Sequence, residues 1–390
     1  MDRISGQKKA IDVLSAALAS GKLHHAYIFH GPLGVGKYST AIAFAKVVLC
    51  HNPMTNLTGQ LAACGHCESC GLFRTIDEAT FEGAVEKDLP KGEEADEAGL
   101  KSPHPDLHIV VKELARYSDN AQIRNRKLTT IPVEVIQENV IDPVYHAPAM
   151  KHGKVFVIDE AELMNQFGQN AILKTLEEPP AGTVLILITS SEDRLLPTIR
   201  SRCQRIVFTP LDDNVVRRWL EDHRTEDMRG LDDGIRSWLI SFAAGSLGRA
   251  VMVLDYQLTE WAQAILPLIE GIARGQATGE LGGMMAKRID EFAKAWVDSH
   301  KGASKEAANK MAAKLMWGMV AEHARAKVQH LSGAITAGDL AGGDATLEPW
   351  LGVIDSITEA EEYYASNVKI DLVCDHLVMK MTQSIYKTQV

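Results

Sequence analysis

A glycine-rich turn near the amino terminus constrains the fold of this chain more than any other feature. Residues 31–37 read Gly-Pro-Leu-Gly-Val-Gly-Lys; a short apolar run at 26–29 precedes them and a segment of helical period at 39–49 follows. Between a strand and a helix, such glycines let backbone N–H groups close around phosphate oxygens, which a lysine can also reach. A turn that only joins the two elements is the simpler alternative. The residues expected to bind the phosphates of a nucleotide are Gly31, Gly34, Gly36 and Lys37.

The residue after Lys37 departs from the usual pattern of such turns. A serine or threonine there ligates Mg²⁺ through its hydroxyl, whereas this chain has Tyr38, whose phenolic oxygen lies much farther from the backbone. Ser39 is no simple replacement, because one helical step rotates a side chain by about 100°. We count Tyr38 and Ser39 among the nucleotide-binding residues, and we expect ATP hydrolysis by this chain to be weak or absent.

Short apolar runs at 107–111, 155–158 and 184–189 predict three further strands, of the kind that is buried on both faces of a parallel sheet. The run at 155–158 ends in Asp159 and Glu160. An aspartate at such a strand end can hold Mg²⁺, and the following glutamate can orient the attacking water. Acidic residues that merely suit a helix N-terminus are the alternative. The glycine-rich turn upstream favours a site for ATP and Mg²⁺.

Four of the six cysteines lie between residues 50 and 70. Their spacing, C-x13-C-x2-C-x2-C, can place four thiolates around one Zn²⁺ in a tetrahedron. No position would remain for water or substrate, so we expect a structural zinc site. A redox pair or free thiols are the alternative, because C-x2-C also serves thiol exchange. The predicted ligands are Cys50, Cys64, Cys67 and Cys70, while Cys203 and Cys374 are expected in the core.

Composition limits what the rest of the chain can do. A net charge of -10 argues against a protein that coats nucleic acid by itself, because that binding needs an excess of lysine and arginine. Residues 76–103 read as a disordered acidic insertion, and the chain from residue 211 onward reads as helix. The sequence has no apolar run long enough to span a membrane and no secretory signal. We therefore expect a cytoplasmic protein without membrane contact.

Two later segments carry a resemblance to a known family. Residues 170–180 read Asn-Ala-Ile-Leu-Lys-Thr-Leu-Glu-Glu-Pro-Pro, and residues 201–203 read Ser-Arg-Cys. At this separation behind the acidic pair, they resemble the clamp-loader branch of the AAA+ proteins, over about residues 4–255. The resemblance implies an α/β fold with three domains: an AAA+ P-loop domain at 1–208 with a zinc module at about 50–70, a helical lid at 209–256, and a helical collar for oligomerisation at 257–390.

The same resemblance implies roles for particular residues. Arg202 would be an arginine finger that acts at a neighbouring subunit's nucleotide, and Glu160 would be catalytic. Thr189, or Ser190 beside it, lies where the family has its sensor 1 residue, and Arg249 resembles the sensor 2 arginine. The implied partners are gamma/tau and delta subunits in a pentameric ring, the sliding clamp and primer–template DNA.

Within the family the choice lies between two subunit types. The segment 104–108, His-Pro-Asp-Leu-His, resembles the delta-prime pattern, as does the stretch 131–141 that leads to Tyr145. Tyr38 also favours delta-prime, whereas the acidic pair Asp159-Glu160 favours the gamma/tau motor. Two other classes stay open: another AAA+ remodelling ATPase, and a scaffold that binds no nucleotide. A small basic cluster, Arg124, Arg126 and Lys127, is either a solvated loop or a contact to DNA phosphate.

Overall fold

The computed structural model describes residues 6–56, 59–73, 102–118, 120–124, 129–276, 279–299, 304–337, 347–366 and 368–388. The chain divides into two compact units, Met1–Val215 with Gly245–Gly248 and Val216–Ala244 with Arg249–Val390. Most of the predicted acidic insertion, 76–101, lies outside the described residues, as do Arg126 and Lys127. The predicted boundary between lid and collar at 256/257 stays a prediction.

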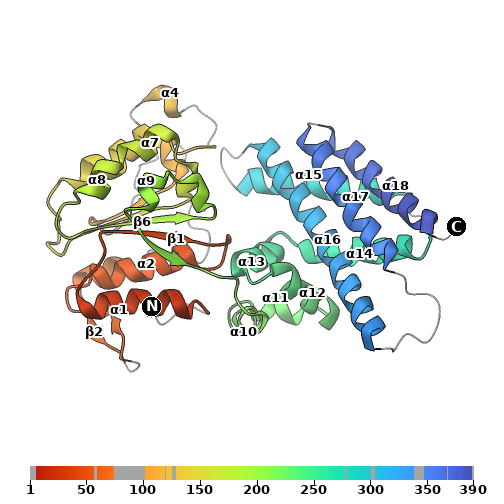
Figure 1. Cartoon of the computed structure of the whole chain (residues 1–390), viewed down its shortest axis with the longest axis horizontal. Helices are drawn as coiled ribbons and strands as arrows, with labels where there is room; N and C mark the ends of the chain where they lie inside the picture. Colours follow the sequence, from red (N-terminus) through yellow and green to blue (C-terminus); the bar gives the residue numbers. More distant parts are fainter. Residues whose placement is uncertain are drawn as a thin grey trace. The chain divides into compact units, whose positions relative to one another are not determined.

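The first unit is built on a parallel sheet of five strands in the order β4-β5-β6-β1-β7 (Figure 1). The central strand β6 pairs with both β1 and β5, and the last strand, β7, pairs with β1. Four strands were predicted from apolar runs, and β7 was not. The strands are β1 (Ala26–His30), β4 (Leu107–Val110), β5 (Lys154–Ile158), β6 (Thr183–Thr189) and β7 (Gln204–Val207).

Helices cover both faces of this sheet, because successive side chains of each strand point to opposite faces. Tyr27 and Phe29 of β1 pack with α1 and α2, whereas Ile28 packs with the helices on the other face. Figure 1 shows α1 and α2 on one side of the sheet and α7, α8 and α9 on the other. Their bounds are α1 (Lys8–Ser20), α2 (Lys37–Val48), α7 (Gln166–Ala171), α8 (Leu173–Glu177) and α9 (Pro197–Arg200).

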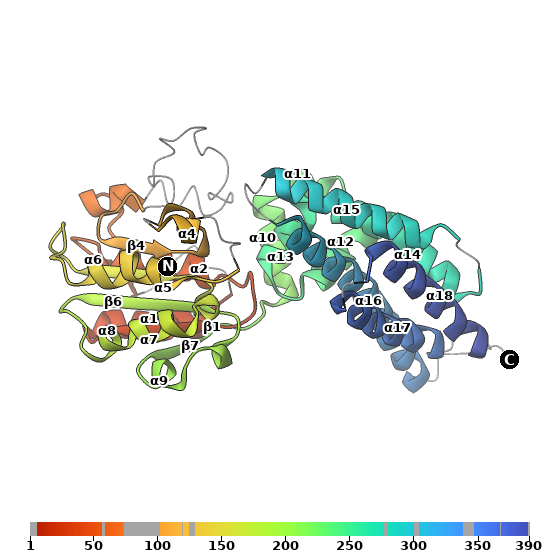
Figure 2. The same ribbon diagram turned by 90° about the horizontal axis from the view of Figure 1, so that it is seen from above.

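Short elements complete the first unit. A small antiparallel hairpin follows α2. Several short helices lead from β4 to β5, among them α4, α5 and α6, which Figure 2 labels. One of these is a π-helical turn, Gln137–Ile141. Single 3-10 turns occur at Lys112–Tyr117, Ala161–Leu163 and Glu192–Arg194. The remaining bounds are β2 (Met54–Thr55), β3 (Leu61–Ala62), α4 (Ala121–Arg124), α5 (Val133–Ile136) and α6 (Asp142–Val144).

The second unit contains only helices among its described residues, as the sequence predicted from residue 211 onward. The four helices α15 to α18 pack against one another around buried side chains such as Met285, Val320, Val353 and Leu377. None of the described helices in the chain is long and apolar enough to cross a membrane. The helices are α10 (Asp213–His223), α11 (Thr225–Arg229), α12 (Asp233–Ala243), α13 (Leu247–Asp255), α14 (Leu258–Ala273), α15 (Leu281–Ser299), α16 (Lys305–Ala337), α17 (Glu348–Ala365) and α18 (Ile370–Thr388).

Candidate functional site

The glycine-rich loop joins β1 to α2 at the carboxyl edge of the sheet, as predicted. Gly31 has to be glycine, because a Cβ there would lie 2.1 Å from the carbonyl oxygen of Phe208. Gly36 precedes the first residue of α2 and has a φ of 96°, a left-handed conformation that residues with side chains rarely adopt. The loop is tied to its surroundings by two backbone bonds, from Gly31 N–H to Thr189 O and from Gly248 N–H to Gly34 O. These bonds fix the backbone of the loop directly before the N-terminus of α2.

Lys37 is buried at the start of α2, and its ammonium lies within the loop. Its Nζ donates to Gly31 O at 2.6 Å and to Pro32 O at 2.5 Å. Burial lowers the pKa of Lys37, while the carboxylates of Asp159 and Glu162 act to raise it. The ammonium thus lies in the electrostatic field of both acidic side chains, and its present partners are neutral carbonyls that an anionic phosphate can replace.

Tyr38 occupies the sequence position of the usual Mg²⁺ ligand, and its side chain packs against the core while its phenol lies near Asp159. It is half-buried and packs against the cluster that α1 and α2 form with the sheet. Burial and the nearby Asp159 carboxylate both raise the pKa of its phenol. The next hydroxyls differ: Ser39 is half-buried, and Thr40 donates from Oγ1 to Gly36 O at 2.7 Å.

Asp159 and Glu160 follow β5 and lie at the same edge of the sheet as the loop. Asp159 accepts the N–H of Glu160 at 2.9 Å through Oδ1. Burial, together with the carboxylates of Glu160 and Glu162, raises the pKa of Asp159 to about 6. A cation beside this carboxyl group would lower its pKa and favour the ionised form.

Glu160 is held by a lysine that the sequence did not single out. Its backbone is left-handed, with a φ of 47°, and its Oε2 lies 2.6 Å from Lys112 Nζ. Lys112 follows β4, which pairs with β5 in the sheet. Although burial acts to lower it, the pKa of Lys112 is raised by Glu160. In this arrangement the Glu160 carboxylate is neutralised by an ion pair.

Glu162 is a third carboxylate that sequence reasoning missed. Its Oε1 accepts from Ser190 Oγ at 2.6 Å and from Ser190 N at 3.0 Å. Burial acts to raise its pKa, but the Ser190 donors lower it. The bonds join the turn after β5 to the end of β6, where Thr189 is buried and accepts the N–H of Ser191 at 3.0 Å. The structure therefore gathers Lys37, Asp159, Glu162 and the Thr189 region at one edge.

Arg202 lies on a turn directly after α9. Its Nη1 donates to Thr198 O at 2.9 Å, and its Nη2 lies 2.6 Å from Glu177 Oε1 at the end of α8. Gln169, buried on α7, also contacts the segment before α9, since its Oε1 accepts the N–H of Leu196 at 2.8 Å. The sequence did not point to Glu177 or Gln169, because their partners come from a different element.

Arg249 belongs to the second unit. Its Nη1 donates to Phe242 O at 3.3 Å, and its guanidinium lies over the Phe242 ring, 5.8 Å from the centroid. Within the described part of the possible basic cluster, Arg124 donates from Nη1 to Ser118 O at 2.9 Å. These contacts do not test the roles predicted for either arginine.

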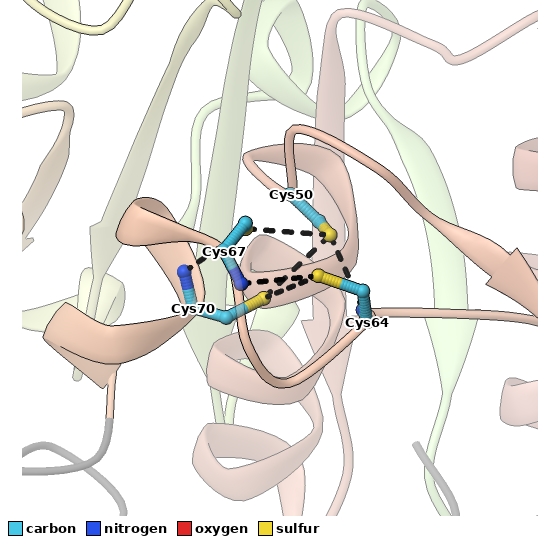
Figure 3. Close-up of side chains that lie close together, drawn as sticks. All are labelled: Cys50, Cys64, Cys67 and Cys70. Carbon is cyan, nitrogen blue, oxygen red and sulfur yellow. Dashed lines mark hydrogen bonds between the residues drawn. The ribbon is translucent and has the colours of Figure 1, made fainter.

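The four predicted metal ligands come together after α2 (Figure 3). Their sulfur atoms all lie within 4.8 Å of one another, with separations of 3.6 Å between Cys50 and Cys70 and 3.9 Å between Cys64 and Cys70. A tetrahedral site with Zn–S bonds of about 2.3 Å separates its sulfurs by about 3.8 Å. No disulfide joins these thiols, so the cluster fits a four-cysteine metal site.

The polypeptide around the cluster acts differently on its thiols: burial raises the pKa of Cys50 and Cys70, whereas backbone donors favour the thiolate of Cys64. The N–H groups of Cys64 and Cys67 donate to the sulfurs of Cys50 and Cys64, both at 3.3 Å. The N–H of His66 lowers the pKa of Cys64 to about 6. A thiolate is the form that binds metal. The remaining cysteines lie elsewhere: Cys374 is buried in the second unit, and Cys203 is half-buried beside the sheet.

A buried serine fastens this cluster to the sheet. Ser69 donates from Oγ to Leu49 O at 2.7 Å and lies 3.0 Å from His104 Nε2. Two residues on, Asp106 accepts the N–H groups of Ala149 and Met150. The segment that begins at His104 therefore links the cysteine cluster to β4 and to the turn before β5.

The sheet, the loop and the acidic strand end define an α/β protein of the P-loop class. The chain belongs to the family described as DNA polymerase III, delta subunit, whose model matches residues 6–212. Among curated relatives, DNA polymerase III subunit tau of Salmonella typhimurium is 29% identical over 252 residues, 65% of this chain and 32% of that protein. DNA polymerase III subunit gamma/tau of Mycobacterium tuberculosis is 29% identical over 256 residues, 65% of this chain and 36% of that protein.

The chain spans about a third of the length of these relatives, from 32% to 36%. Among solved structures, a DNA polymerase III gamma subunit-related protein of Thermotoga maritima is 14% identical, with a TM-score of 0.42 over 96% of this chain and 99% of that one. The Thermotoga maritima RuvB Holliday junction branch migration motor is 13% identical, with a TM-score of 0.37 over 79% of this chain and 85% of that one.

Proposed function

We propose that this protein is a clamp-loader subunit of the delta-prime type within the AAA+ family. In this role it joins gamma/tau and delta subunits in a pentameric ring that loads the sliding clamp onto primed DNA in the cytoplasm. It would belong to the DNA-directed DNA polymerase holoenzyme. Its main contribution would be to position the partner subunits, and its own ATP hydrolysis would be weak or absent. Support comes from the match of residues 6–212 to the DNA polymerase III delta family and from relatives named as DNA polymerase III subunits.

The tyrosine at position 38 is the observation that carries the delta-prime assignment. The loop has the glycines and Lys37 of a phosphate-binding loop, yet the next residue offers a partly buried phenol that packs against the core in place of a small hydroxyl. When bound, Mg²⁺ would neutralise phosphate charge. Asp159 is the residue that would hold it, and the loop N–H groups and Lys37 would bind the phosphates. Without the hydroxyl this chain would bind ATP weakly and hydrolyse it slowly or not at all.

Two further roles complete the proposal. Arg202 would act in trans as an arginine finger, since its turn is exposed on the first unit and a guanidinium suits spread phosphate charge. Thr189 and Arg249 would serve as the sensor residues, as the resemblance implies. The four cysteines would hold one structural Zn²⁺ that fixes the segment after α2 to the sheet through Ser69 and His104.

The gamma/tau motor is the second candidate. The pair Asp159 and Glu160 is intact, and the relatives that match over 65% of this chain are named gamma, tau or gamma/tau. Against it stand Tyr38 and the ion pair of Glu160 with Lys112, which occupies the carboxylate that would orient water.

Co-purification separates the candidates. The tagged chain would be expressed with gamma/tau-type and delta-type subunits, and the purified complex and the isolated chain would both be assayed for bound nucleotide and ATP turnover. The delta-prime type predicts a stable complex and slow turnover by the isolated chain. Vigorous turnover by the isolated chain would favour the motor, and failure to enter any complex would contradict the clamp-loader role.

A further inference from the structure

Arg202 forms a surface ion pair with Glu177 through the same guanidinium that is proposed to act at a neighbouring subunit's nucleotide. Nη2 of Arg202 lies 2.6 Å from Glu177 Oε1, and Nη1 donates to Thr198 O at 2.9 Å. The side chains are 34% and 49% exposed. A guanidinium cannot lose its charge, so it always needs an anionic or polar partner.

The turn that carries Arg202 does not depend on this ion pair. Its backbone is closed by bonds from Ser201 N to Pro197 O and from Arg202 N to Ile199 O, both at 3.0 Å. The Ile199 side chain is fully buried beneath it. On the other side, Glu177 ends α8 above the buried Leu176. Both ends of the pair are therefore anchored by other contacts, and the pair can open without loss of local structure.

We infer that Glu177 is a positioning residue that holds Arg202 in the absence of a neighbouring nucleotide and competes with phosphate for it. The inference rests on the proposed trans role of Arg202. The Thr198 carbonyl keeps one side of the guanidinium oriented, while the Glu177 carboxylate occupies the side that a phosphate would take. A multiply charged phosphate outcompetes one exposed carboxylate for the guanidinium. The ion pair therefore raises the ATP concentration at which the neighbour's site is half-saturated, but it does not block that site.

The size of this competition follows from the exposure of the pair. Exposed ion pairs are weak, so the paired state of Arg202 and Glu177 is favoured over the open state by only a small factor. Competition of that strength from Glu177 weakens the apparent affinity of the neighbour's site for ATP about two- to sixfold. Removing the carboxylate should lower the apparent KM for ATP by that factor and leave kcat unchanged. The difference should shrink at high salt, because exposed charges are screened.

The test uses the reconstituted complex with ATP as the probe and compares Glu177→Gln with Glu178→Gln. Glu178 is the next residue and is exposed, and among the described residues it forms no ion pair, so it controls for the loss of a negative charge at this surface. We expect a lower KM for Glu177→Gln alone, with no such effect when Arg202→Ala is also present. Equal KM values for the two glutamine variants, or the same shift with and without Arg202, would overturn the inference.

Failure of the inference can be told from failure of the proposed function. If Arg202→Ala lowers hydrolysis and Glu177→Gln behaves as Glu178→Gln, the trans role stands and the competition is wrong. If Arg202→Ala has no effect, the trans role is wrong and the inference falls with it. Thermal unfolding of each variant shows whether the fold is kept, and Glu177→Asp, which retains a shorter carboxylate, should give an intermediate KM.

Discussion

Tyr38 is the residue on which the proposed weak ATP hydrolysis depends. Its ring is partly buried and packs against the core, and it takes the place in sequence of the small hydroxyl that is usual in such loops. On the proposed function, this position has lost a metal ligand and gained a packing contact. The consequence can be tested by restoring a hydroxyl, because the rest of the loop, including Lys37, is in place.

Tyr38→Thr should raise the Mg²⁺-dependent affinity for ATP or the rate of turnover, because it returns a β-hydroxyl to the first turn of α2. It should also lower the free energy of unfolding by about 1–3 kcal/mol, since a half-buried ring is removed. Titration with ATP, with and without Mg²⁺, measures the first effect. Tyr38→Phe is the control, which keeps the ring and should bind as the wild type does; equal binding by all three proteins would contradict the role of Tyr38.

His108 makes stability sensitive to acid. Its ring stacks on Phe156 at 4.5 Å, and burial together with Lys154 lowers the pKa of His108 to about 4. The folded state therefore favours the neutral ring. The stabilisation is complete above the unfolded pKa of about 6.5 and is lost as the pH falls from there toward 4.

His108→Phe should reduce this loss, because phenylalanine keeps the stacked ring and cannot be protonated. Urea unfolding at pH 7.5 and pH 5 measures the change in the free energy of unfolding for each protein. The exposed His330→Gln serves as the control and should lose as much as the wild type. A loss in His108→Phe equal to that of the wild type would show that other groups cause the acid sensitivity.

Strands with a continuous apolar run were predictable, including β4 at one edge of the sheet, whereas β7 at the other edge was not. The runs that form β1, β5 and β6 are apolar throughout because helices cover both sides of the sheet. Strand β7 escaped prediction because it begins with Gln204 and Arg205 and buries only Ile206, so it has no long apolar run. The three apolar residues at 206–208 were the only signal available in this segment.

The predictability of the site residues depended on their spacing along the chain. The loop, the acidic pair and the four cysteines are contiguous or closely spaced, so the sequence pointed to them. Lys112, Glu162 and Glu177 escaped because each acts through a partner on another element. Only the pairing of β4 with β5, and of β5 with β6, brings the first two to the loop. Such strand pairings cannot be predicted from the spacing of residues along the chain.

The cysteine cluster should behave as one structural element. Cys67→Ser should lose zinc, which metal analysis of protein purified without chelator measures, because three thiolates hold the metal less tightly than four. The free energy of unfolding should fall, while circular dichroism should keep the signal of the sheet and helices. Cys203→Ser removes a thiol outside the cluster and should retain one zinc per chain. Wild-type protein without zinc would contradict the site.

The chain as a whole is acidic and divides into two compact units. A net charge of -10 does not support strong binding to DNA by the isolated chain. The glycine-rich loop and Arg202 lie in the first unit, and Arg249 lies in the second. The sequence placed the change from α/β to helical structure near residue 210, but it could not show that Gly245–Gly248 packs with the first unit, since that contact depends on Gly34.

The trans role of Arg202 is best tested where a neighbour is present. In the assembled ring, Arg202→Ala should reduce DNA-stimulated ATP hydrolysis at the affected site, where such a finger contributes on the order of a thousandfold or more. Arg202→Lys should recover little of this loss, because an ammonium lacks the planar fork that binds spread phosphate charge. The isolated variants should unfold at the wild-type temperature and bind ATP as the wild type does, since the side chain lies on the surface and its pair with Glu177 is exposed. If the ring that carries Arg202→Ala hydrolyses ATP and loads clamps at the wild-type rate, Arg202 is a surface arginine and the neighbour's site is completed by another residue.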